Sequence, residues 1–259
     1  MKEALGLRGG FVVLVFLACV LLERALPRRR PVGDAATRWG ANLGLMVLGW
    51  LVAFALPFAA TGAAWTAEEH RWGLLNLRSI WLPAKIALSV VLLDLVVYLQ
   101  HRLFHAVPWL WRAHAVHHTD LDLDATSGLR FHPVELALST AIKAGAAAFL
   151  GLHFLGVALF EGLLAAGSIF SHSNLDLGPL DRVARLLVVT PDMHRIHHSP
   201  SREETDSNFG FFIPWWDRLF GTYRRDPRED HATMTLGLDG AREDLGFVAL
   251  VARPFRSRA

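Results

Sequence analysis

Residues 80–105 read IWLPAKIALSVVLLDLVVYLQHRLFH and join an apolar run directly to a His-x-x-x-His motif. The run, from about Ile80 to Leu99, has the roughly 20 residues that a helix needs to cross a membrane. Asp94, His101 and His105 follow one another at offsets of seven and four, so they lie on one face of the continued helix. The stretch predicts a membrane helix with two imidazoles at its end and Asp94 as a carboxylate that orients one of them.

The composition of the whole chain also indicates a membrane protein. Of its 259 residues, 53% are hydrophobic, and the mean hydropathy of +0.31 is too apolar for an ordinary soluble domain. The formal net charge is +2, with many arginines in loops, which suits lipid headgroups and argues against nucleic acid as a partner. The single cysteine, Cys19, excludes a disulfide framework, a thiolate metal site and an iron–sulfur cluster built from this chain alone.

Three further apolar stretches predict more membrane spans. They run from Phe11 to Leu22, from about Trp39 to Ala60, and from about Val134 to Phe170. The last exceeds one crossing, and Gly151 and Gly156 offer a place to bend it into a hairpin that either crosses twice or dips into the membrane. The expected fold is all-α: a polytopic membrane bundle of about four spans, the last a hairpin, with a cytosolic helical cap that carries histidine clusters.

Basic residues around the first span predict its orientation. Two precede the span and five follow it, so the positive-inside rule places the following loop in the cytoplasm. Those five are Arg24, Arg28, Arg29, Arg30 and Arg38. Two further crossings then bring everything after Leu99 to the cytoplasmic face.

Eight of the 13 histidines form three tight clusters. The clusters are His101-Arg-Leu-Phe-His105, His114-Ala-Val-His117-His118 and His194-Arg-Ile-His197-His198. Residues three and four apart share a helix face, so each cluster is expected to aim two or three ring nitrogens at one point. Eight imidazoles exceed the four to six ligands of one zinc or iron ion, so the pattern predicts two metal ions.

These motifs together resemble the fatty acid hydroxylase / sterol desaturase superfamily of membrane di-iron enzymes. The similarity covers roughly Val90 to Tyr223 and extends beyond the clusters. It includes Trp111-Arg112-x-His114-x-x-His117-His118-Thr119, Arg130-Phe131-His132-Pro133-x-Glu135, Phe170-x-His172-x-Asn174, Leu177-Gly178-Pro179 before Thr190-Pro191-x-x-His194, and Asn208-Phe209-Gly210 before Trp216-Asp217-x-Leu219-Phe220-Gly221-Thr222.

The resemblance implies a metal centre with His172 added to the clustered histidines. The expected ligands are His101, His105, His114, His117, His118, His172, His194, His197 and His198. The residues expected to support them are Asp94, His132, Glu135 and Asn174, with no catalytic residue beyond the ligands. Some relatives carry a further histidine where this chain has Ser168, so the ligand count of one metal stays open.

By the same resemblance, the cofactor is a pair of iron ions, with zinc as a substitute, and the activity is that of an O2-dependent monooxygenase. Such an oxidoreductase hydroxylates or desaturates a C–H bond of a lipid or sterol-like substrate taken from the bilayer. We expect electrons from an external reductase and a small carrier, because no dinucleotide-binding loop or iron–sulfur motif is present. The expected organisation is N-terminal spans over 1–79, a di-iron domain over 80–224 and a cytosolic tail over 225–259.

The small size and the lack of an endoplasmic-reticulum retention signal suggest a multi-pass protein of a bacterial inner membrane. Two other functions would also use histidine clusters. A dizinc hydrolase is disfavoured because no His-Glu-x-x-His motif occurs and no cluster contains a carboxylate base. A metal transporter is disfavoured because its ligands would follow the spans, whereas these clusters fall at span ends and in the cap.

Overall fold

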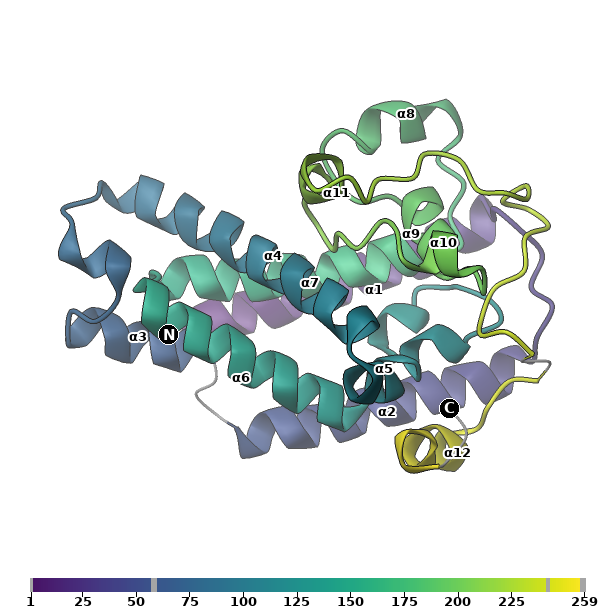
Figure 1. Ribbon diagram of the computed structural model, residues 1–259, viewed down its shortest axis with the longest axis horizontal. Coiled ribbons are helices and arrows are strands. Elements are labelled where there is room, and N and C mark those ends of the chain that lie inside the picture. Colours follow the sequence, from purple (N-terminus) through teal and green to yellow (C-terminus); the bar gives the residue numbers. More distant parts are fainter. Residues whose placement is uncertain (1, 57–59, 241–242, 257–259) are drawn as a thin grey trace.

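The computed structural model describes residues 2–56, 60–240 and 243–256, and these residues form helices joined by loops. The long helices are α1 (Lys2–Ala25), α2 (Ala35–Ala55), α4 (Leu82–Ala106), α6 (Pro133–Leu150) and α7 (Phe154–His172), and they run along the length of the molecule (Figure 1). The shorter helices are α3 (Ala60–Glu69), α5 (Pro108–His114), α8 (Asp181–Ala184), α9 (Pro191–His197), α10 (Arg202–Thr205), α11 (Trp215–Leu219) and α12 (Phe247–Ala252). Turns of 3₁₀-helix are η1 (Leu74–Leu77), η2 (His117–Thr119), η3 (Ser127–Leu129), η4 (Gly178–Leu180) and η5 (Arg253–Phe255). The predicted all-α fold is confirmed.

Four helices of the described chain are long and apolar enough to cross a membrane: α1 from Gly6, α4, α6 and α7. The range predicted as the second span, Trp39 to Ala60, forms most of α2 and the start of α3, and its residues 57–59 lie outside the described part. Within the part of the chain that the structure describes, α2 is not one of the four.

The predicted hairpin bends at Gly151, which ends α6 with a φ of 69°. A Cβ there would lie 2.8 Å from the carbonyl oxygen of Trp72, so both the backbone conformation and the available space favour glycine. Gly156 has a different role from the one expected: it lies inside α7, where a Cβ would come within 2.6 Å of Ser89 on α4. Each arm of the hairpin is a candidate span in its own right.

The apolar core lies between α3, α4, α6 and α7, and α1 packs along the outside of α7. On α1, Leu7, Leu14 and Leu21 are 76%, 66% and 66% exposed, which is the surface expected of a helix that faces lipid. Glu161 on α7 is paired with Arg8 of α1 and lies 3.8 Å from the amine of Lys143 on α6. This ion cluster ties three helices together.

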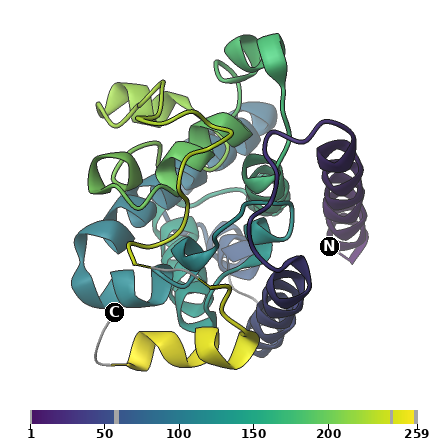
Figure 2. The ribbon, with the colours of Figure 1, turned by 90° about the vertical axis from the view of Figure 1, so that its right-hand side faces the viewer.

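The chain after α7 forms a cap over one end of the long helices. Figure 1 shows α8, α9, α10 and α11 gathered at that end, beside the last turns of α4 and α7. In the view of Figure 2, α12 lies across the base of the molecule next to α2, on which it packs. The ends of α4 and α7 and the start of the cap therefore meet in one place, where the histidine motifs lie.

Candidate metal centre

Nine buried histidines converge in two groups, and they are the nine that the sequence predicts as ligands. The first group, site A, consists of His101, His105, His114, His118 and His197. The second, site B, consists of His117, His172, His194 and His198. Within each group, one ring nitrogen of every member lies within 4.8 Å of the others, and no member is more than 8% exposed.

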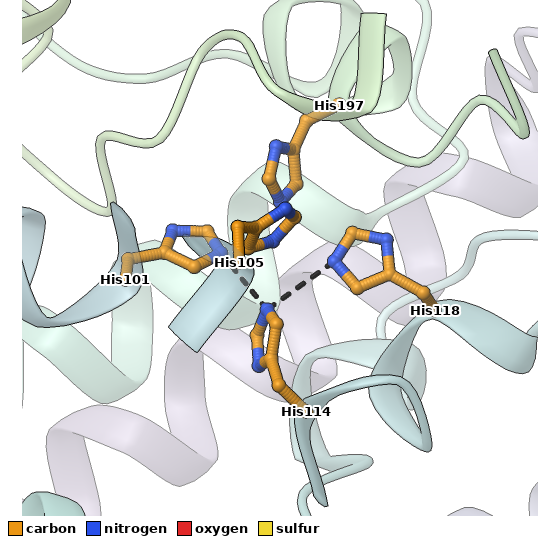
Figure 3. Close-up of side chains that lie close together, drawn as sticks. All are labelled: His101, His105, His114, His118 and His197. Carbon is orange, nitrogen blue, oxygen red and sulfur yellow. Dashed lines mark hydrogen bonds between the residues drawn. The ribbon is translucent and has the colours of Figure 1, made fainter. Parts of the chain in front are cut away.

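Site A collects side chains from four separate elements. The last two turns of α4 carry His101 and His105, α5 ends at His114, η2 provides His118, and α9 provides His197. Figure 3 shows their rings pointing toward a common centre, with the Nε2 of His114 between those of His101 and His118. Five nitrogens around one point are the donor set of a transition-metal ion.

Site B lies directly beside site A. It takes His117 from η2, His172 from the end of α7, and His194 and His198 from α9 and its C-cap. The ring of His198 stacks on the site A ring of His118, with their centroids 4.5 Å apart. The two donor sets are therefore adjacent.

Each His-x-x-His-His motif divides its nitrogens between the two sites, which differs from the expectation that a cluster would point at one place. The helix α5 ends at His114 and the chain continues as the 3₁₀ turn η2, so His117 and His118 face different sites. On α9, His194 and His198 are four residues apart and share site B, while His197 turns to site A.

Hydrogen bonds at Nδ1 fix the orientation of most of these rings. A carbonyl oxygen can only accept, so each ring facing one carries its proton on Nδ1 and keeps a lone pair on Nε2. These pairs are His101 with Phe209 O (2.8 Å), His117 with Arg130 O (3.1 Å), His172 with Ser168 O (2.6 Å) and His197 with Ser207 O (2.8 Å). Two carboxylates act in the same way, Glu135 on His114 (2.7 Å) and Asp206 on His105 (3.2 Å).

The resulting lone pairs meet in a way that suits a cation. The Nε2 atoms of His101 and His114 are 3.0 Å apart, and those of His117 and His172 are 2.9 Å apart. With the protons on Nδ1, neither pair forms a hydrogen bond, so a positive charge between the nitrogens would stabilise both. The residues present therefore fit a pair of metal ions.

Burial keeps five of these imidazoles neutral. It lowers the pKa of His117, His118, His194 and His198 well below its usual value, with the neighbouring imidazoles adding to the effect. For His197 the pKa falls to about 3, again chiefly through burial. Metal ions bind the neutral ring, so these five histidines can bind a metal at physiological pH without first losing a proton.

Glu135, among the predicted supporting residues, contacts a member of site A. It is 4% exposed and accepts the Nδ1 proton of His114. His132 instead caps α6 by accepting from the amide of Val134, while its Nε2 lies 3.2 Å from Val251 O. It belongs to neither site and positions the helix that carries Glu135.

Asp94 and Asn174 differ from the expectation that they would support a ligand. Asp94 accepts hydrogen bonds from the indole of Trp216 (2.8 Å) and the amide of Ile213 (3.4 Å). It therefore holds the cap in place instead of orienting a histidine ring. The amide of Asn174 exchanges two hydrogen bonds with the backbone of Arg29, at 3.2 and 2.8 Å. It holds the α1–α2 linker in place.

Asp217 is a supporting residue whose role sequence reasoning missed. Its carboxylate is fully buried and accepts from the amides of Phe209 (2.8 Å) and Gly210 (2.9 Å) and from the Thr222 hydroxyl (2.7 Å). It thereby holds the segment whose carbonyls orient His101 and His197. The motifs around Phe209 and Asp217 were visible in the sequence, but their contact was not.

Comparison with known proteins agrees with this geometry. The model of the fatty acid hydroxylase family matches residues 86–222, more than half of the chain. Ornithine lipid hydroxylase OlsE of Rhizobium tropici is 34% identical over 174 residues, which cover 66% of this chain and 50% of that protein. Human alkylglycerol monooxygenase is 30% identical over 61% of this chain and 34% of its own length.

A cholesterol 25-hydroxylase-like protein of Danio rerio is 29% identical over 56% of this chain and 57% of its own. The chain thus spans half of the length of the ornithine lipid hydroxylase and about a third of that of the human enzyme. No solved structure matches with significance.

Proposed function

The chain belongs to the fatty acid hydroxylase family, and from this premise we propose that it is a membrane di-iron monooxygenase that hydroxylates a C–H bond of a lipid. The observation that carries this proposal is the pair of adjacent sites, of five and four buried histidines, beside the ends of membrane-length helices. An all-imidazole donor set is neutral, so it leaves the full charge of the metals available for redox chemistry. Bound there, a di-iron centre would supply the activation of O2 and the oxidation of the C–H bond.

The protein's own residues hold and enclose the centre. Carbonyl and carboxylate partners keep the protons of six rings on Nδ1, so that their lone pairs face the metals. All nine rings are buried, which excludes water from the place where a C–H bond would react and limits side reactions of the oxidant. Glu135 is buried against site A, and it keeps the proton on Nδ1 of His114.

The names of the relatives favour a lipid substrate and hydroxylation over desaturation. The reaction consumes one O2, two electrons and two protons, and gives the hydroxylated lipid and water. The electrons come from an external reductase and a small carrier. The substrate is a lipid or sterol-like molecule drawn from the surrounding bilayer.

The centre faces the cytoplasm in this proposal. Arg28 in the basic linker between α1 and α2 is paired with Asp192 of α9 at 3.1 Å, and Pro27 forms a β-bridge with Leu175. The basic linker and the histidine sites therefore lie at the same end of the bundle. The positive-inside rule then places both on the cytoplasmic side, of a bacterial inner membrane in our proposal.

Metal analysis tests the function. The protein is purified in detergent from iron-replete cells, its bound metals are quantified, and its optical and Mössbauer spectra are recorded after dithionite reduction and again after addition of O2. We expect close to two irons per chain and a spectrum that responds to oxygen. Two zincs that persist after iron reconstitution, with no response to oxygen, would favour hydrolysis; little bound metal would favour transport.

A further inference from the structure

An apolar groove of about 180 Å³ lies where α1, α7 and the cap meet. Phe11 and Val15 line it from α1, Leu163 from α7, and Val189 and Phe212 from the cap. Every lining residue is apolar, and no polar atom contributes to the exposed wall. We propose that this groove binds the acyl chain of a bilayer lipid and leads it to the histidine centre, an inference that rests on the proposed function.

The residue that precedes Phe212 in the chain connects this wall of the groove with the histidines. Phe211 is the neighbour of Phe212, and its ring centroid lies 4.9 Å from that of His101 in site A and 6.4 Å from that of His194 in site B. The ring of Phe211 thus contacts both sites, while its backbone carbonyl packs against Gly167, which lines the groove. A chain that displaced its ring would bring a C–H bond up to the centre.

The backbone around this wall is packed closely enough to fix its position. Gly167 on α7 faces the groove, and a Cβ there would lie 3.0 Å from the carbonyl oxygen of Phe211. The amide of Val189 donates to Phe212 O at 3.0 Å, which pairs the two cap segments that line the groove. The groove is therefore a built feature of the contact between α7 and the cap.

The position of the groove selects a membrane lipid as its occupant. Two of its walls are candidate membrane spans, and Phe11 on α1 is itself 44% exposed. The cap segment that leads to Val189 continues the apolar surface, since Leu180, Leu186 and Leu187 are 71%, 55% and 64% exposed. An exposed apolar band beside a spanning helix is a surface that enters the bilayer interface, so a lipid chain reaches the groove without crossing water.

A larger cavity, of about 550 Å³, lies between the ends of α1 and α2 and is a poorer place for an acyl chain. Its lining includes the charged side chains of Glu23, Arg38 and Asp124, and the latter two are paired with each other at 2.9 Å. None of the nine histidines lines it.

Photo-crosslinking tests the proposal without requiring turnover. The iron-loaded full-length protein is placed in phosphatidylcholine vesicles that contain palmitic acid with a diazirine near its methyl end, and the crosslinked residues are mapped by mass spectrometry. We expect crosslinks at residues 163–170 and 188–189. Leu163→Trp and Val15→Trp, on different helices, each fill the groove and should lower this labelling about tenfold, the effect of excluding roughly two methylene groups from apolar contact.

The matched controls are Leu159→Trp and Leu14→Trp, on the same two helices, whose wild-type side chains are 51% and 66% exposed and do not line the groove. The two controls should be crosslinked to the same extent as the wild type, and all four variants should keep their iron. Labelling spread evenly over the lipid-facing helices, and unchanged in Leu163→Trp, would overturn the groove while leaving the function standing. Groove labelling without hydroxylation of any lipid would support the groove and count against the proposed function alone.

Discussion

The carboxylate of Glu135 is the residue-scale feature with the clearest consequence for metal binding. It accepts the Nδ1 proton of His114 at 2.7 Å, and its second oxygen is buried with no hydrogen-bond partner among the described residues. Glu135→Gln removes the negative charge that strengthens His114 as a ligand. Since partners of this kind contribute about 10–100-fold to metal affinity, we expect a loss of that order in a chelator-competition titration.

The control for this substitution is Glu203→Gln, the same change at a carboxylate that is 68% exposed and paired with Arg228. It should leave metal affinity unchanged. Equal affinity in Glu135→Gln and the wild type would show that His114 does not depend on the carboxylate.

His172 and His132 are both buried histidines with different roles. His172 belongs to site B, whereas His132 caps α6. His172→Ala should reduce bound iron from about two per chain toward one, since it leaves site B with three nitrogens. His132→Ala should keep the iron content and lower stability by about 1 kcal/mol, the usual effect of losing an N-cap. Metal quantification and thermal unfolding in detergent measure both effects, and loss of iron in His132→Ala alone would reverse the assignment.

Acid should destabilise the metal-free protein. The folded-state pKa of His117, His118, His194, His197 and His198 is lowered by burial. In the unfolded chain these rings take up protons as the pH falls through about 6.5, whereas the folded protein does not. The unfolded state then binds more protons, so the free energy of unfolding falls with falling pH. We expect the Tm in detergent to drop between pH 7.5 and 5.5, and a constant or rising Tm would contradict this.

At the scale of elements, the segment from Ser207 to Gly210 connects the cap to site A. Its carbonyls orient His197 and His101, and Asp217 holds its amides. Asp217→Asn keeps the size of the side chain but places an NH2 group against a backbone amide, so one buried donor loses its partner, at about 1–3 kcal/mol. We expect a lower Tm and partial loss of iron, while Asp226→Asn, at a carboxylate that is 81% exposed, changes neither.

The elements themselves were largely predictable from local signals. The apolar run to Leu99 continues as α4 to Ala106, and Gly151 ends α6 as the hairpin requires. The division of the two His-x-x-His-His motifs was not predictable, because helical spacing alone places a whole motif on one face. In the first motif α5 ends at His114, before His117 and His118, and in the second His197 turns away from His194 and His198. The partners of Asp94 and Asn174 could not be predicted from the sequence either, since both contacts join residues more than 100 positions apart.

For the whole molecule, the prediction with the widest consequence concerns the side of the membrane that carries the histidine sites. Arg28 pairs with Asp192, and the sites lie at the C-terminal end of α4, so the loop before Leu82 lies at the opposite end of that span. If the basic linker is cytoplasmic, the cap is cytoplasmic and the α3–α4 loop is external. The single native cysteine, Cys19, is 4% exposed and gives little background labelling, so introduced cysteines can report on each side.

Asp226→Cys places a thiol in the cap, and Arg71→Cys places one in the loop after α3. In intact cells, a membrane-impermeant maleimide should label Arg71→Cys and not Asp226→Cys, and both should react once the membrane is permeabilised. The reverse pattern would put the histidine sites outside the cytoplasm, where a cytosolic reductase could not supply electrons.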